Sequence, residues 1–330
     1  MAMWSVLSGL AVSGARVVPR RLRRGPLHPG WTLTFEIFAD ALKTSAVRIN
    51  KVPPSEQGRE WARVSPPHPI VKRVRFEETS AGGVPAEWVL PRDGAEGAPV
   101  VLHLHGGWYS SASPRNFHEW LARLVLAVGS ARLLSLDYRL APEHPFPAAI
   151  DDALAAWRWL LASGVKPSRT VIVGESAGGG LAAALMLRLR DAKEPLPAAA
   201  ALLSPWVDLS ARGGSLETNA PFDWCEPEDV PNRVRYYLGD RDPTTLLASP
   251  ALADLRGLPP LLVQAGGAEM LLDQGVRFAE KARNAGVPVT LDVVPGMIHV
   301  GHLLATVSSD ARAAIDRIAV FISSSVGGSA

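Results

Sequence analysis

From residue 99 onward, short apolar segments rich in β-branched residues alternate with segments of helical pattern, and few architectures accommodate that rhythm. Alternation of this kind is the signature of a mostly parallel sheet with helices on both faces. The expected strands are Val100–Leu104, Leu133–Asp137, Thr170–Val173, Ala199–Leu203, Leu261–Gln264 and Val287–Val294. The expected helices are 116–128, 147–162, 177–190, 271–285 and 304–323. The sequence therefore predicts an α/β fold for most of the chain.

Residues 1–65 lie outside this alternation and have a helical, partly irregular pattern. Large apolar residues recur there at spacings of four, three and four, which places them on one helix face: Trp31, Phe35, Phe38 and Leu42. A helix with such a face needs another part of the protein to cover.

A Pro-rich stretch at 64–70 marks the end of this region. After it, Val71–Phe76 and Ala86–Leu90 are expected as short strands joined by a turn at Gly82 and Gly83. These two strands would precede the parallel sheet in the chain.

A second break in the alternation lies between Ser204 and Leu261. This interval is too long for a simple strand connection and too aromatic for a linker, so we interpret it as part of a helical cap. The expected organisation is 1–65 as N-terminal cap helices, 66–204 as the first part of the core, 205–250 as a cap insertion and 251–330 as the second part of the core.

Charge and cysteine content bear on the expected partner and compartment. With 34 Lys and Arg against 32 Asp and Glu, the net charge of +2 gives no reason to expect a nucleic-acid partner. The single cysteine, Cys225, leaves no pair for an internal disulfide and is compatible with a reducing cytoplasm, where we expect the protein. The oligomeric state stays open, a homodimer being one possibility.

The N-terminal run MAMWSVLSGLAVSGA is apolar, and five arginines follow it with no acidic residue in positions 1–30. A secretory signal carries its positive charge before the apolar run, and this run is too short to span a bilayer. We therefore expect an amphipathic helix that packs on the protein. Transient attachment to a membrane surface is the lesser alternative.

The stretch VIVGESAGGG runs from an expected strand into an expected helix, with Ser176 between Gly174 and Gly178. This G-x-S-x-G spacing is the pattern of a nucleophile elbow. Such a turn holds the serine Oγ above the sheet edge and aims the backbone N–H of Ala177 at a developing oxyanion. A glycine-rich turn with an incidental serine is the competing interpretation.

A serine nucleophile needs a base, and the base needs a carboxylate that fixes its tautomer and stabilises its charged form. In α/β-hydrolases the three residues follow in the order serine, acid, histidine, on loops after successive strands. Glu269 follows the expected strand that ends at Gln264, and His299 follows the one that ends at Val294. These residues are therefore the candidate acid and base.

An oxyanion needs hydrogen-bond donors besides Ala177. The stretch LHLHGGWYS follows the first parallel strand, and its His105-Gly106-Gly107-Trp108 is close to the HGGG loop of lipases and esterases. Trp108 replaces the third glycine. Its backbone N–H can still donate, and we expect its indole to line the substrate pocket.

Six motifs together resemble the hormone-sensitive-lipase-like branch of the α/β-hydrolases: HGGWYSSASPRN, DYRLAPEHPFPAAIDD, GESAGGG, SPWVDLS, GLPPLLVQAG and GMIH. The resemblance covers about residues 70–323. It implies an α/β-hydrolase fold with a helical cap and a serine carboxylesterase that needs no cofactor. The implied substrates are esters of short to medium acyl chains.

On the residues that match, the resemblance implies Ser176 as nucleophile, His299 as base, Glu269 as acid, and the N–H groups of Gly107, Trp108 and Ala177 as the oxyanion hole. The residues expected in the substrate pocket are Trp108, Tyr109 and Trp206. Because the family commonly has Asp as the acid, Asp273 is the alternative to Glu269. His302 is the alternative to His299.

Functions other than ester hydrolysis differ in the residues that they require. No paired Cys/His or acidic cluster stands at ligand spacing, so no metal is expected. A lactone hydrolase or amidase with the same triad stays open. A ligand-binding receptor on this fold, without a catalytic histidine, is disfavoured because Glu269 and His299 are both present.

Overall fold

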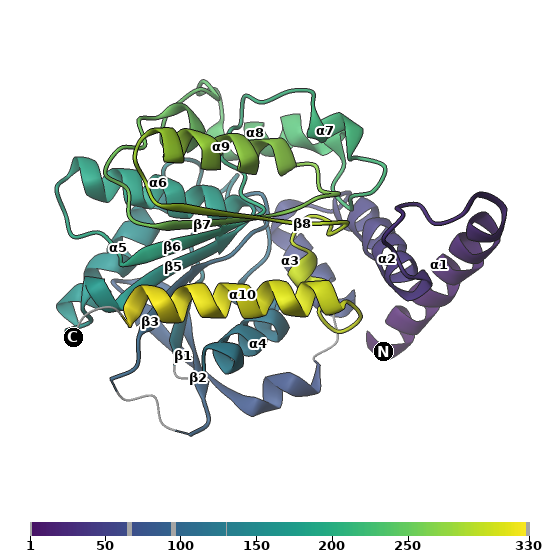
Figure 1. Cartoon of the computed structure of the whole chain (residues 1–330), viewed down its shortest axis with the longest axis horizontal. Helices are drawn as coiled ribbons and strands as arrows, with labels where there is room; N and C mark the ends of the chain where they lie inside the picture. Colours follow the sequence, from purple (N-terminus) through teal and green to yellow (C-terminus); the bar gives the residue numbers. More distant parts are fainter. Residues whose placement is uncertain (1, 65–67, 94–96, 130, 328–330) are drawn as a thin grey trace.

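The structure, a computed structural model, describes residues 2–64, 68–93, 97–129 and 131–327 (Figure 1). Its centre is an eight-stranded sheet in the order β1-β2-β4-β3-β5-β6-β7-β8. The strands are β1 (Val74–Ala81), β2 (Val84–Pro91), β3 (Val100–Leu104), β4 (Arg132–Leu136), β5 (Thr170–Glu175), β6 (Ala199–Leu203), β7 (Leu261–Gly266) and β8 (Val289–Val294). From β4 to β8 all neighbours are parallel, and β2 pairs antiparallel with both β1 and β4. This is the mostly parallel sheet that the sequence predicts.

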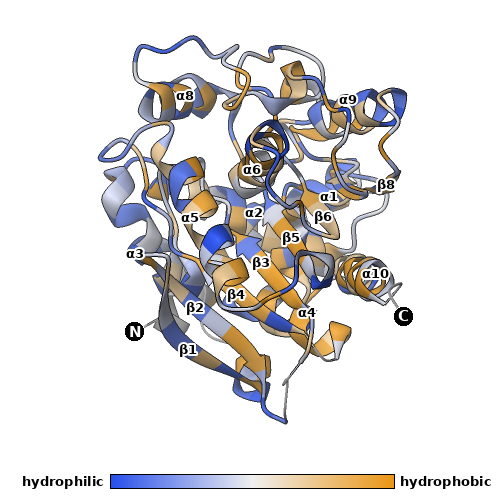
Figure 2. Cartoon of the chain, turned by 90° about the vertical axis from the view of Figure 1, so that its left-hand side faces the viewer, coloured by the Kyte–Doolittle hydropathy of each residue, from blue (hydrophilic) through white to orange (hydrophobic). Residues whose placement is uncertain are grey.

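Helices cover both faces of the sheet (Figures 1 and 2). One face carries α4 (His118–Val128) and α10 (Ser309–Val326), and the other carries α5 (Ala148–Ala162), α6 (Ala177–Asp191) and α9 (Leu272–Asn284). Every residue of β3, β5, β6 and β7 is buried, as expected for parallel strands with both faces covered.

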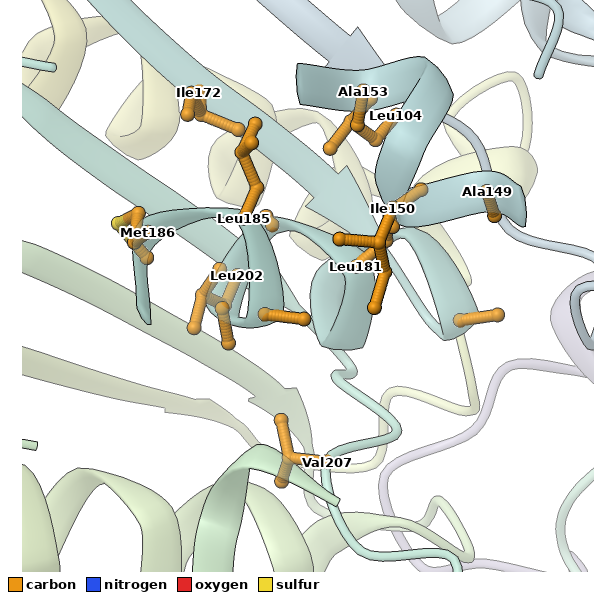
Figure 3. Close-up of a cluster of buried hydrophobic side chains, with 14 of the residues drawn as sticks. Leu104, Ala149, Ile150, Ala153, Ile172, Leu181, Leu185, Met186, Leu202 and Val207 are labelled. Carbon is orange, nitrogen blue, oxygen red and sulfur yellow. The ribbon is translucent and has the colours of Figure 1, made fainter. Parts of the chain in front are cut away.

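Alternate residues of the strands enter two separate apolar layers. Leu102 and Ile172 pack on the side of α6, in one cluster with Leu181. Figure 3 shows Ile172 and Leu181 among the residues of this cluster. Their neighbours Val101 and Val171 pack on the side of α10. The period of two along each strand therefore produces the two layers of the core.

The remaining helices are α1 (Ala2–Arg24), α2 (Leu33–Ile49), α3 (Pro54–Val64), α7 (Ser215–Thr218) and α8 (Val230–Leu238). The predicted apolar face of α2 is confirmed. Trp31 and Phe35 are buried against Ile298 and Leu304, and Phe38 and Leu42 pack on the same cluster. The N-terminal helices thus form a cap that is fastened to the C-terminal loops of the sheet.

The strand expected at 71–76 was placed too early. A short 3₁₀ helix occupies Pro69–Arg73, and β1 begins only at Val74. The His68 side chain accepts a hydrogen bond from the N–H of Ile70, so it caps this helix, and Pro69 has the fixed φ that suits a first helical position. The turn at Gly82 and Gly83 lies where it was expected.

The last helix also begins later than expected. Residues Gly301–Leu304 form a 3₁₀ turn, and α10 starts at Ser309, where the Ser308 hydroxyl accepts a hydrogen bond from the N–H of Ala311. The helix begins directly after the N-cap residue Ser308, in the sequence Ser308-Ser309-Asp310, although the apolar pattern starts before it. The other strands and helices after residue 99 agree with their expected bounds to within two residues.

Candidate active site

Ser176 lies at the junction of β5 and α6, with φ +56° in a left-handed conformation. The flanking glycines follow from close packing. A Cβ on Gly174 would overlap the carbonyl oxygen of Gly178, and a Cβ on Gly178 would overlap that of Leu104. The G-x-S-x-G spacing therefore reflects a sharp strand-to-helix turn in this chain, and the turn presents Ser176 at the carboxyl edge of the sheet.

His299 lies in the loop that follows β8. Its Nε2 is 2.9 Å from Ser176 Oγ, a hydrogen-bond distance between residues 123 positions apart in the sequence. Burial lowers the pKa of His299 to about 3, with a smaller contribution from His302. The neutral imidazole that results can accept the proton of the serine hydroxyl.

Glu269 follows β7 and reaches the other side of the imidazole. Its Oε2 lies 3.9 Å from His299 Nδ1, and it accepts a hydrogen bond of 2.5 Å from the hydroxyl of Ser204. Within the described residues, neither Glu269 Oε1 nor His299 Nδ1 has a hydrogen-bond partner. The two unpartnered atoms belong to adjacent groups, and hydrogen bonds of a catalytic site are often long before substrate binds.

Burial and hydrogen bonding act in opposite directions on the Glu269 carboxyl. Burial raises its pKa to about 8, whereas the Ser204 hydroxyl lowers it. An imidazolium forming on His299 would also favour the carboxylate. Burial thus disfavours the charged carboxylate, whereas the Ser204 hydroxyl and an imidazolium on His299 favour it.

The two alternative residues lie elsewhere. The Asp273 carboxylate accepts a hydrogen bond of 2.9 Å from the N–H of Ser215, and Ser215 Oγ accepts one of 3.0 Å from the N–H of Asp273. His302 Nε2 lies 2.5 Å from the side-chain oxygen of Gln264, beside the ring of Trp120. These contacts hold neither residue against Ser176.

Asp223 fixes both loops of the candidate triad, a role that sequence reasoning missed. One carboxylate oxygen accepts hydrogen bonds from the N–H groups of His299 (3.0 Å) and Trp224 (2.8 Å). The other accepts one of 2.8 Å from the N–H of Met270. Trp224 adds a hydrogen bond of 2.6 Å from its indole N–H to the carbonyl of His299. Residues between β6 and β7 thereby position the base and the acid.

The expected oxyanion hole lies beside Ser176. Gly107 has φ +115° and Trp108 has φ +61°, so the loop after β3 turns back sharply on itself. The carbonyl of Gly107 accepts hydrogen bonds from the N–H groups of Ser110 and Ser111. The N–H groups of Gly107, Trp108 and Ala177 donate to no other group in the described parts of the chain, which leaves them free for an oxyanion.

Glu175 is the residue directly before the candidate nucleophile. It is fully buried, and its two carboxylate oxygens accept hydrogen bonds from the N–H of Gly106 (2.7 Å) and from Nε2 of His103 (2.8 Å). His105 donates from Nδ1 to the carbonyl of Gly106 and stacks on Tyr138. These contacts hold the loop that carries the candidate oxyanion donors.

Above this edge of the sheet lies a cavity of about 690 Å³, and both Ser176 and His299 are in its wall. Trp108 lines it, as expected, and so do Phe38 and Leu42 of α2, Trp61 of α3 and Trp224. The cavity therefore lies between the cap and the core.

The pocket assignment is corrected for Tyr109 and Trp206, which do not line this cavity. Tyr109 stacks on Tyr237 at 3.8 Å between ring centroids, and Trp206 packs edge-to-face behind Trp108 at 5.1 Å. Both are about 1% exposed. Their large rings belong to the apolar core that supports the wall.

No group of three or more His, Cys, Asp or Glu side chains that could hold a metal ion occurs in residues 2–64, 68–93, 97–129 and 131–327. No helix in those ranges is long and apolar enough to cross a bilayer. The arrangement provides a serine, a neutral histidine and free N–H donors, which are the groups that acyl transfer to a serine uses.

The sheet, the elbow and the order of the site residues define the class of α/β-hydrolases. A model of a family with the α/β-hydrolase fold matches residues 101–303. An acetyl-hydrolase of Streptomyces hygroscopicus is 43% identical over 251 residues, which are 75% of this chain and 82% of that protein. An esterase of Acinetobacter venetianus is 35% identical over 80% of this chain and 86% of its own length.

Solved structures agree. An esterase from the bacterial hormone-sensitive lipase family superposes with a TM-score of 0.81 at 41% identity, covering 88% of this chain and 98% of that one. The chain belongs to this hormone-sensitive-lipase-like family of α/β-hydrolases, and it is a carboxylic ester hydrolase.

Proposed function

We propose that this enzyme hydrolyses carboxylic esters of short to medium acyl chains through an acyl-enzyme on Ser176. The observation that carries the proposal is the 2.9 Å approach of His299 Nε2 to Ser176 Oγ, at an elbow beside unpaired N–H groups. The serine hydroxyl therefore has a base at hydrogen-bond distance, and the ester carbonyl oxygen has N–H donors beside the serine.

In the first half of the reaction, Ser176 Oγ attacks the ester carbonyl while His299 Nε2 takes its proton. The negative charge that develops on the carbonyl oxygen is stabilised by the N–H groups of Gly107, Trp108 and Ala177. The imidazolium returns its proton to the leaving alcohol as the C–O bond breaks. Glu269 stabilises the imidazolium while it exists.

In the second half, water replaces the alcohol. His299 takes a proton from the water, whose oxygen attacks the acyl carbonyl, and then gives the proton to Ser176 Oγ as the acid leaves. The same N–H groups stabilise the second tetrahedral intermediate. Ser176 and His299 return to their starting states.

The acyl preference is supported by the limited volume of the cavity between cap and core, about 690 Å³, and by a relative named as an acetyl-hydrolase. We further propose that residues 1–65 and 205–250 act together as the cap. Three contacts join the two segments: Lys43 to the carbonyl of Ala220, Asn50 to Asp229, and Arg233 to Gln57. A cap built in this way limits the length of the acyl group that can be accommodated.

A series of p-nitrophenyl esters with increasing acyl length tests this proposal. We expect kcat/KM to be highest for short and medium chains and Ser176→Ala to lower kcat by about a thousandfold or more. Wild-type protein treated with an organophosphate should carry the label on Ser176, and the Ser176→Ala variant should remain unlabelled. Turnover above about a tenth of wild type in that variant would refute the assignment. A receptor would bind such esters without turnover.

A further inference from the structure

The helix α1 presents an apolar face to solvent. Its buried positions, Ser13 and Val17, lie on the side that packs on α2, and the opposite side carries exposed apolar residues at helical spacing. Four of them are large: Leu7 (55% exposed), Val12 (55%), Val18 (36%) and Leu22 (83%). The small residues Ala11 and Ala15 continue the same surface, which we call the outer face of α1.

The charge beside this face has one sign. The helix contains five arginines and no acidic residue. Arg16 pairs with Asp40, and Arg20 and Arg21 pair with Glu36, so these three belong partly to the contact with α2. Arg23 and Arg24, next to Leu22, are exposed.

This combination favours an anionic lipid surface over a second copy of the chain. A symmetric contact between two outer faces would offer Arg23 and Arg24 no acidic partner on the facing helix, because α1 contains none, and unpaired charges beside an interface oppose association. A bilayer with anionic headgroups instead takes up apolar side chains at its surface and attracts the arginines.

Helix α1, which carries this surface, also lies beside the cavity of the candidate active site. The helix lies at the outer edge of the molecule (Figure 1). Gly9 and Leu10, on the turn after Leu7, line the same cavity as Ser176. A surface that contacts α1 is therefore next to the cavity.

We propose that the outer face of α1 docks on anionic lipid bilayers, with Leu7, Val18 and Leu22 at the level of the acyl chains and Arg23 and Arg24 at the headgroups. If the proposed ester hydrolysis is correct, docking presents the cavity to esters dissolved in the membrane. Binding to the surface does not depend on that hydrolysis.

Co-sedimentation of the full chain with vesicles tests the docking. Vesicles of phosphatidylcholine with about 30% phosphatidylglycerol should bind the protein, and pure phosphatidylcholine should bind it much more weakly. Binding should fall at about 0.5 M NaCl, where charges are screened within a few ångströms. Equal binding to both kinds of vesicle, or none to the anionic kind, would overturn the proposal.

Two variants locate the surface. The triple change Leu7→Gln, Val18→Gln and Leu22→Gln should weaken binding by more than about tenfold, since it removes the apolar anchors. The pair Arg23→Gln and Arg24→Gln should weaken it about fivefold for each charge removed. Matched controls far from α1 are Val320→Gln, also exposed and apolar, and Lys166→Gln, also exposed and basic. Both controls should bind as wild type does.

Two further measurements separate the alternatives. Hydrolysis of a soluble acetate ester should be unchanged in all these variants, which shows that they are folded. If wild type lacked hydrolysis but still bound vesicles, the proposed function would fail and the docking would stand. If the wild type were a dimer that the triple change converts to a monomer, a second copy would cover the outer face and the docking would be refuted.

Discussion

The carboxylate of Glu175 accepts a hydrogen bond of 2.7 Å from the backbone N–H of Gly106, the residue before the candidate oxyanion donors. Because Glu175 precedes Ser176 in the chain, one buried side chain fixes the oxyanion loop relative to the nucleophile. The other carboxylate oxygen is held by His103, which in turn contacts Ser135 Oγ.

Replacing Glu175 with Ala should lower kcat by about tenfold to a hundredfold, because loss of one well-aligned oxyanion donor has an effect of that order or larger. KM for a small ester should change little. The isosteric Glu175→Gln should keep much more activity. Its amide oxygen can accept from Gly106, and its amide NH₂ can donate to His103 if that ring takes the other tautomer.

Steady-state kinetics and thermal unfolding of both variants decide the role of Glu175. A purely structural side chain would lower the Tm in Glu175→Ala and leave kcat of the remaining folded enzyme intact. That result would contradict the positioning role.

Sequence reasoning succeeded where a residue follows a strand. Ser176, Glu269 and His299 each come after a strand whose carboxyl end lies at the same sheet edge, so their meeting could be predicted from pattern alone. The apolar face of α2 was predicted from its spacing for the same kind of reason.

Residues that act through backbone groups were missed. Glu175, Ser204 and Asp223 hold loops by contacts with N–H groups or with other side chains, and no periodicity records which distant loop a side chain will reach. The expectation for Tyr109 failed because the loop after Trp108 has left-handed backbone angles, which turn its ring into the core. Only the folded loop determines that direction.

The identity of the acid can be decided with two isosteric changes. Glu269→Gln should lower kcat by about a thousandfold or more, because it removes the charge that supports the imidazolium. Asp273→Asn should leave kcat within about twofold and reduce the free energy of unfolding by about 1 kcal/mol, since its carboxylate caps a loop at Ser215 and lies 4.0 Å from the guanidinium of Arg277. Ester hydrolysis and urea unfolding measure the two effects. The reverse order of kcat losses would move the acid role to Asp273.

The buried histidines predict how stability depends on pH. Burial lowers the pKa of His105 and His302 to about 4 and that of His299 to about 3, whereas in the unfolded chain each titrates near 6.5. Below about pH 6.5 the unfolded chain therefore binds protons that the folded chain does not, and stability falls as the pH is lowered.

Two buried acids act with the opposite sign. Burial raises the pKa of Asp223 to about 6 and that of Glu269 to about 8, so the folded chain holds protons that the unfolded chain releases. They reduce stability as the pH rises. Between about pH 6 and 4.5 the unfolded chain binds protons on the three histidines, and the folded chain holds protons on the two acids. The difference is about one proton, so the free energy of unfolding should fall by about 1.4 kcal/mol per pH unit on acidification.

His302→Gln provides the check, since its amide nitrogen can still donate to Gln264 and it does not titrate. Urea unfolding at several pH values gives the slope of the free energy of unfolding against pH. Between about pH 6 and 4.5 this slope should correspond to about one proton fewer than in wild type, so most of it should disappear. A slope equal to that of wild type would mean that His302 is not responsible.

Trp108 is where the oxyanion loop departs furthest from the HGGG pattern, and its indole has two neighbours besides the cavity. The ring packs edge-to-face on Trp206, and the guanidinium of Arg233 lies 5.9 Å from its centroid. The backbone at Trp108 has φ +61°, a conformation that glycine adopts without strain. A glycine can therefore keep the N–H donor while it removes the wall.

Trp108→Gly should accordingly change kcat/KM for acetate esters by no more than about threefold and raise the relative specificity for bulkier esters, because the enlarged space costs little where the substrate is small. Trp108→Ala is the matched control: it removes the same indole but restricts the backbone more than glycine does. If both variants shift specificity alike, the indole sets the size of the pocket. If activity toward every ester falls by about a hundredfold in both variants, the indole itself holds the donor geometry, since that is the effect of losing an oxyanion donor. If it falls in Trp108→Gly and much less in Trp108→Ala, backbone restriction by any side chain holds that geometry.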